Sequence, residues 1–175
     1  MCKAVFLPYS GYKWVILGLL TLNVFIFAGT GALVNAIDAL SWVMLLVMFE
    51  LESAPKQAPF TKTQRRHIRN VLIGMIVVVF AIFINHNEWL DVANATLWFM
   101  LIALLEVEIR WPHIAGKYRQ ALRSLTITVF TGLLLLVFVW FSRSQWLDAY
   151  DAALWIVAFA VIEVDFKKFL QLKTS

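Results

Sequence analysis

The chain has 175 residues, of which 62% are hydrophobic and 15% are charged, and this composition excludes an ordinary soluble domain. Its single cysteine, Cys2, excludes an internal disulfide and any multi-cysteine metal site. The formal net charge of +4 does not indicate nucleic-acid binding, because the basic residues are spread over short connections between apolar segments instead of covering one face.

Residues 14–37 carry no charge and are long enough to cross a hydrocarbon core of roughly 30 Å. Apolar segments of the same kind occupy residues 71–84 and 125–141, and each of the three precedes a polar turn, a second apolar segment and an acidic end. The sequence therefore predicts three tandem two-helix hairpins within a single membrane domain that spans residues 1–175. The expected internal repeats cover residues 12–53, 67–109 and 121–166.

The second half of each hairpin carries one copy of a motif. It reads Asp/Asn-x-x-Asp/Asn-Ala-x-x-Trp, then seven apolar residues, then Glu-x-Glu/Asp. The copies begin at Asn35, Asp91 and Asp148. Six fixed positions that recur in register three times indicate an internal repeat rather than chance similarity.

The two polar positions that open the motif lie where a helix is expected to begin. Asp or Asn at an N-cap accepts a hydrogen bond from a free backbone N–H, and an acid three residues later suits the positive end of the helix dipole. We therefore predict an outer helix-capping ring, with a cation-attracting ring as the alternative. Its members are Asn35, Asp38, Asp91, Asn94, Asp148 and Asp151.

The second apolar segments have short charge-free cores, so they either cross the membrane completely or re-enter it. If they cross, all four basic patches fall on one face, as the positive-inside rule favours. These patches are Lys3 with Lys13, and residues 56–69, 110–123 and 167–173. We therefore predict six transmembrane helices in a membrane such as the bacterial inner membrane, with both termini cytoplasmic. Trp89 and Trp146 then fit the aromatic belt on the outer side.

Helical phase orients the motif helices. At about 100° per residue, the polar positions, the tryptophan and the acids of each motif share one arc of about 160°. Because charged groups in membrane segments face the bundle interior, this arc should face protein and the opposite apolar face should face lipid. Parallel repeats then predict a pseudo-threefold axis along the membrane normal, surrounded by a central aromatic layer. The layer consists of Trp42, Trp98 and Trp155.

The acidic ends of the motifs predict an intramembrane acidic ring near the cytoplasmic side. Its members are Glu50, Glu52, Glu106, Glu108, Glu163 and Asp165. The first acid of each pair lies deeper in the membrane, so we expect it to matter more. Three states are open: the acids pair with interfacial bases such as Lys13, Arg69 and Arg123, some of them are protonated or bind a passing cation, or they hold a divalent ion.

The remaining residue patterns give no indication of a metal site or of an enzyme active site. The three histidines lack metal-ligand spacing, and the sequence holds no phosphate-binding glycine loop, nucleophile elbow or zinc-protease motif. We therefore expect no metal and no cofactor, and an enzyme is the less favoured interpretation. The expected partners are the lipid bilayer and other membrane subunits or further copies of the chain, without nucleic acid.

Two functions fit this pattern. A structural or accessory subunit of a larger membrane assembly is favoured, because three central tryptophan-bearing helices would leave little room for a hydrated ion. The alternative is a small-cation or proton channel or transporter that uses the acidic ring.

Overall fold

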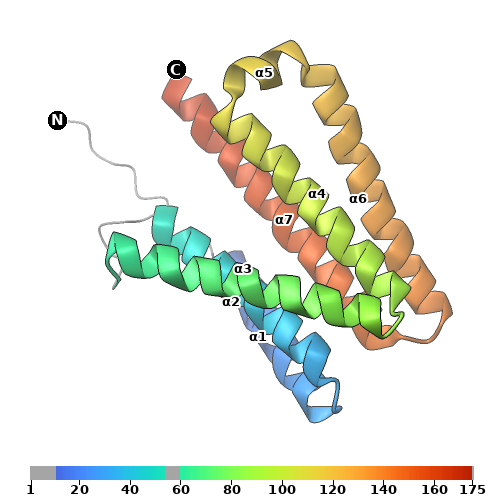
Figure 1. Cartoon of the computed structure of the whole chain (residues 1–175). Coiled ribbons are helices and arrows are strands. Elements are labelled where there is room, and N and C mark those ends of the chain that lie inside the picture. Colours follow the sequence, from blue (N-terminus) through green and yellow to red (C-terminus); the bar gives the residue numbers. More distant parts are fainter. Residues whose placement is uncertain (1–10, 54–59, 175) are drawn as a thin grey trace. The chain divides into compact units, whose positions relative to one another are not determined.

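The computed structural model describes residues 11–53 and 60–174, and every regular element in these ranges is an α-helix (Figure 1). The helices are α1 (Gly11–Gly29), α2 (Leu33–Ser53), α3 (Lys62–Asn85), α4 (Trp89–Arg110), α5 (Pro112–Lys117), α6 (Arg119–Ser142) and α7 (Trp146–Thr174). Only the helical backbone is described for residues 12, 49–53, 62, 109, 110, 112 and 161–174. The predicted all-α fold class is therefore confirmed.

The helices form two compact units, residues 1–79 and residues 80–175, and the boundary between them falls inside α3. In the first unit, α1 packs against α2. In the second unit, α6 lies against both α4 and α7, and the short helix α5 connects α4 to α6 (Figure 1). Gly132 on α6 lies close to α4, since a Cβ at this position would lie 3.1 Å from Leu97 Cδ1.

Three helical segments are long and apolar enough to cross a membrane: Thr63–Asn85, Trp89–Glu108 and Arg119–Ser142. Lys13–Gly29 and Leu33–Met48 are shorter apolar segments in the part of the chain that the structure describes. These lengths and compositions suggest membrane association. The total of six crossings and the pseudo-threefold axis stay predictions, because the two units are each described separately.

Large apolar side chains cover the outward faces of the long helices. On α6, Leu135 and Phe138 are exposed, and on α3, Val77 and Val78 are exposed. The opposite face of α3 is buried along Leu72, Ile76, Val79 and Phe83, whose spacing follows one side of a helix. Exposed large apolar side chains on several helices favour contact with lipid or with a partner protein.

The hydroxyl groups of these helices bond to their own backbone. On α6, Thr126 donates to the carbonyl of Leu122 at 3.0 Å, and Thr131 donates to that of Ile127 at 2.8 Å. On α4, Thr96 donates to the carbonyl of Val92 at 2.7 Å. Because these hydroxyl donors are satisfied within a single helix, the outward faces present few groups that need water.

The turns between α1 and α2, between α3 and α4, and between α6 and α7 share one geometry. The middle residue of each turn has a positive φ: 84° at Gly31, 60° at Asn87 and 61° at Ser144. The next residue donates its backbone N–H five residues back, from Ala32 to Phe27, from Glu88 to Phe83 and from Gln145 to Trp140, each at 3.0 Å. This hydrogen bond and a left-handed residue define the Schellman motif, which ends a helix and turns the chain sharply.

The substitution Ser144→Gly should stabilise the chain by about 1 kcal/mol, because glycine adopts a positive φ without the steric cost of a Cβ. The free energy of unfolding in detergent micelles is the measurement. Ser142→Gly is the matched control, since Ser142 ends α6 and donates its hydroxyl to the carbonyl of Val139 at 2.7 Å. This control should lose roughly 0.5 kcal/mol, and a gain at both positions would contradict the turn geometry.

Candidate functional site

An aromatic cluster fills the contact between α4 and α7. Trp98 on α4 and Trp155 on α7 are 5% and 6% exposed, and their ring centroids lie 6.4 Å apart in an edge-to-face arrangement. The Phe159 ring lies 4.8 Å from that of Trp98 and 6.3 Å from that of Trp155. The structure therefore brings together two members of the predicted aromatic layer. Trp42 is half-buried in the other unit and stays a predicted third member.

The motif faces inward in all three helices, as helical phase predicts. The alanine three residues before each tryptophan is buried, and the residue two positions after it is exposed. The buried alanines are Ala39, Ala95 and Ala152, and the exposed residues are Met44, Met100 and Val157. Two residues correspond to about 200° around a helix, so the exposed side is opposite the tryptophan.

The first polar position of the motif is not an N-cap, which corrects the prediction. Because the Schellman turns end so sharply, α2, α4 and α7 begin at Leu33, Trp89 and Trp146. The first polar residue is therefore the third residue of each helix. The residue before α4 is Glu88, whose side chain makes no capping hydrogen bond. Asp91 and Asp148 still lie in the first turn, where the helix dipole favours a negative charge.

All six residues of the predicted outer ring are half-buried. They are Asn35, Asp38, Asp91, Asn94, Asp148 and Asp151. In the second unit, the charges of Asp91 on α4 and Asp148 on α7 lie close enough to repel one another, and Glu88 adds to the repulsion on Asp91. The Oδ1 atom of Asn94 is buried and accepts no hydrogen bond from the described residues. Equivalent motif positions of two helices thus carry carboxylates that influence one another electrostatically.

The predicted acidic ring is described at one motif only. On α4, Glu106 is half-buried and Glu108 is exposed. The side chains of Glu50, Glu52, Glu163 and Asp165 lie outside the described residues. The ring therefore stays a prediction. Within the described residues, no three His, Cys, Asp or Glu side chains gather in an arrangement that would hold a metal ion.

Sequence reasoning missed two fully buried polar residues of the first hairpin. Asn23 on α1 and Ser41 on α2 have no exposed surface, and the Ser41 hydroxyl donates to the carbonyl of Ile37 at 2.7 Å. The signal was present, because a polar side chain in the middle of an apolar segment faces a neighbouring helix rather than lipid. Asn23 therefore marks the face of α1 that packs inward.

Comparison with protein-family models, with curated proteins and with solved structures gives no match to this chain. Its function has to be inferred from its own residues: the aromatic cluster, the polar residues near the turns, and the basic connections at the opposite helix ends.

Replacing Trp98 with alanine should reduce the free energy of unfolding by about 3–5 kcal/mol, because it leaves a cavity beside Trp155 and Phe159. Thermal or denaturant unfolding in detergent micelles measures this loss. Trp89→Ala on the same helix is the control, since Trp89 is 61% exposed, and it should cost less than about 1 kcal/mol. Equal losses for the two variants would show that the cluster does not stabilise the α4–α7 contact.

Proposed function

We propose that this chain is a non-enzymatic membrane protein that crosses the bilayer six times and acts as a structural or accessory subunit of a larger membrane assembly. The observation that carries the proposal is the pairing of an aromatic-filled interior with apolar outward faces. Such a chain holds its helices together through buried rings such as Trp98 and Trp155, and it offers lipid and partner subunits the exposed apolar side chains of its outward faces. In this proposal the partners are the bilayer and either other membrane subunits or further copies of the chain.

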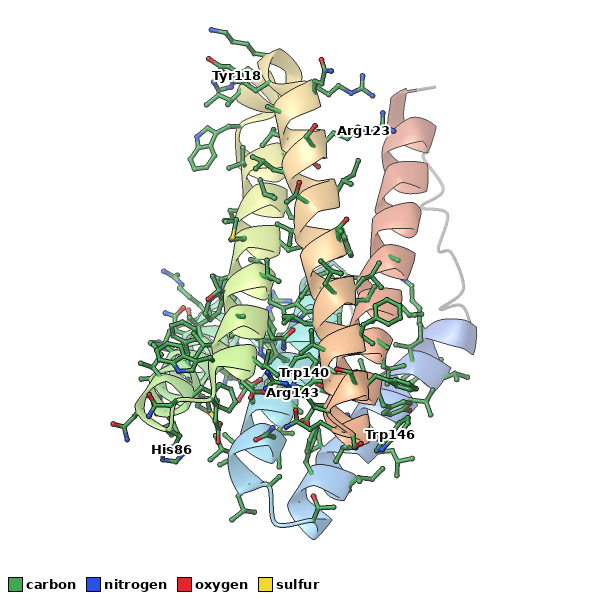
Figure 2. The ribbon with its side chains drawn as sticks, turned by 90° about the vertical axis from the view of Figure 1, so that its right-hand side faces the viewer. His86, Tyr118, Arg123, Trp140, Arg143 and Trp146 are labelled. Carbon is green, nitrogen blue, oxygen red and sulfur yellow. The ribbon has the colours of Figure 1, made fainter. Side chains whose placement is uncertain are left out.

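The length of α6 supports the membrane setting. This helix carries no charge between Arg123 and Arg143, and it rises roughly 30 Å over that distance, which is about the thickness of the hydrocarbon core. Figure 2 shows Arg123 near one end of α6, with Arg143 and Trp146 near the other. Trp146 is exposed there, and its ring lies 4.4 Å from that of Phe141. Aromatic side chains at this level suit a membrane–water interface.

The basic connections support the orientation. The connection from α4 to α6 carries several Lys and Arg residues, whereas the turn that follows α6 carries Arg143 alone. Positive charge gathers on cytoplasmic loops, so the first of these connections is placed in the cytoplasm and the turn outside. With six crossings, the three Schellman turns share the outer side and both termini are cytoplasmic, as in a bacterial inner membrane.

Single cysteines at Lys62 and Lys117, in a Cys2→Ser background, should react with an impermeant thiol reagent only in inverted membrane vesicles. A cysteine at His86, in the turn before α4, should react only in right-side-out vesicles. His86 is a better reporter than its neighbour Asn87, whose positive φ would strain a cysteine. If Lys62 and Lys117 label from opposite sides, the second helix of a hairpin does not cross, and the six-span proposal fails.

A small-cation or proton channel or transporter is the second candidate, and one observation favours it. Asp91 and Asp148 repel one another from equivalent motif positions of α4 and α7, near the end that this orientation places outside. Two neighbouring carboxylates attract cations or share a proton. Against conduction, Trp98 and Trp155 lie about 10 Å further along the same helices, and their packed rings leave little room for a hydrated ion.

Liposomes containing the purified full chain distinguish the two candidates. The structural proposal expects proton and potassium fluxes equal to those of empty liposomes. The channel alternative expects a flux that Asp91→Asn and Asp148→Asn each reduce at least about tenfold, since charge removal eliminates the cation site. Trp89→Ala is the control, because it changes an exposed ring near the same end without altering charge. A flux with this pattern would overturn the structural proposal.

A further inference from the structure

We propose that the connection between α4 and α6 binds the headgroups of anionic phospholipids. The surface in question, termed the α5 surface, consists of Trp111, Lys117, Tyr118, Arg119 and Arg123. The proposal rests on the proposed function, because it requires the chain to sit in a bilayer, and it adds a lipid class that the chain recognises. The occupant is the anionic bilayer surface itself, rather than a soluble phosphate compound.

The charge of the α5 surface is of one sign. Between Glu108 and Asp148 the sequence contains no acidic residue. Lys117, Arg119 and Arg123 are all exposed, and Arg119 and Arg123 lie one helical turn apart on α6. Glu108, which is exposed at the end of α4, is the nearest acid along the chain and offsets only part of this charge. The complementary partner is therefore an array of anionic groups.

Exposed aromatic rings accompany these bases. Trp111 and Tyr118 are 45% and 53% exposed, and they directly precede and follow α5 in the sequence. The Lys117 ammonium lies 5.3 Å from the centre of the Tyr118 ring, so a cation and a ring occupy the same place. Trp and Tyr prefer the headgroup level of a membrane, where one part of the ring is apolar and the other is polar. The aromatic rings favour a lipid surface over a phosphate ion in water.

The position of the α5 surface agrees with this partner. Figure 2 shows Tyr118 and Arg123 near one end of the second unit, opposite the end that bears Trp140, Arg143 and Trp146. Arg123 and Arg119 begin the uncharged stretch of α6, and long basic side chains at such a boundary extend toward the headgroups. Clusters of Lys and Arg next to a transmembrane helix attract anionic lipid on the cytoplasmic leaflet. The basic side chains and the aromatic rings of the α5 surface thus lie at the same end of α6, at the level expected for one membrane interface.

The test compares lipid binding by the parent chain and by variants that lose positive charge at one end of α6 or at the other. The full chain in neutral detergent is mixed with phosphatidylglycerol and phosphatidylcholine, and native mass spectrometry gives the ratio of the two lipids bound. Arg123→Gln should lower the preference for phosphatidylglycerol about fivefold, and K117Q/R119Q/R123Q should lower it at least about tenfold. Arg143→Gln, the matched control at the other end, should leave it unchanged.

Three results would overturn the inference. The first is a parent chain with no preference for phosphatidylglycerol, and the second is an equal loss in Arg123→Gln and Arg143→Gln. The third is displacement of the bound lipid by inorganic phosphate, which would make the surface a phosphate site. Circular dichroism of each variant shows that a loss of lipid does not come from unfolding.

A separate measurement distinguishes failure of the proposed membrane function from failure of the lipid-binding inference alone. The parent chain should insert into liposomes of pure phosphatidylcholine and resist alkaline extraction. Insertion without a preference for phosphatidylglycerol overturns only the α5 surface and leaves the membrane function standing. If the parent does not insert, the proposed function fails, and the lipid inference fails with it.

Discussion

Long apolar helices impose one constraint on this chain: each polar group that they carry has to be satisfied within the chain or placed at a helix end. The backbone meets this constraint through helical hydrogen bonds, and the threonines of α4 and α6 meet it by donating to carbonyls of their own helix. The charged residues of α6 satisfy this constraint because they lie near its ends, and none lies between Arg123 and Arg143. The alternation of long apolar helices with short polar connections follows from this requirement.

The Schellman turns then determine where the motif lies along its helix. A left-handed residue lies two positions after the end of each first helix, and the second helix begins two positions after that residue. This geometry places the first polar residue in the third position of the helix, where its charge interacts with the dipole without capping the first turn. The same register puts the polar residues near the turns and the tryptophans about 10 Å further along, so a polar layer precedes an aromatic one.

These two layers explain why a structural function is preferred over conduction. Asp91 and Asp148 repel one another electrostatically, but the packed rings of Trp98, Trp155 and Phe159 follow directly along the same helices. A path for a hydrated ion would need the rings to separate, at the expense of buried aromatic contact. The aromatic cluster is better suited to holding α4 against α7, which leaves the outward faces available for lipid or partner subunits.

The sequence by itself determined the helical fold class and the inward face of the motif helices, because periodicity is a local property. The predicted apolar span of residues 14–37 was wrong as a single segment, since α1 ends at Gly29 and the chain turns at the left-handed residue Gly31. The sequence failed at the helix starts, since the register of each Schellman turn sets where the next helix begins and Ser144 is not a residue type that favours the left-handed conformation. Only the tertiary structure decided that Trp98 meets Trp155 and Phe159, that the charges of Asp91 and Asp148 repel one another, and that Asn23 is buried. Helical phase specifies which side of a helix faces inward, but the neighbour that it meets depends on how separate helices pack against one another.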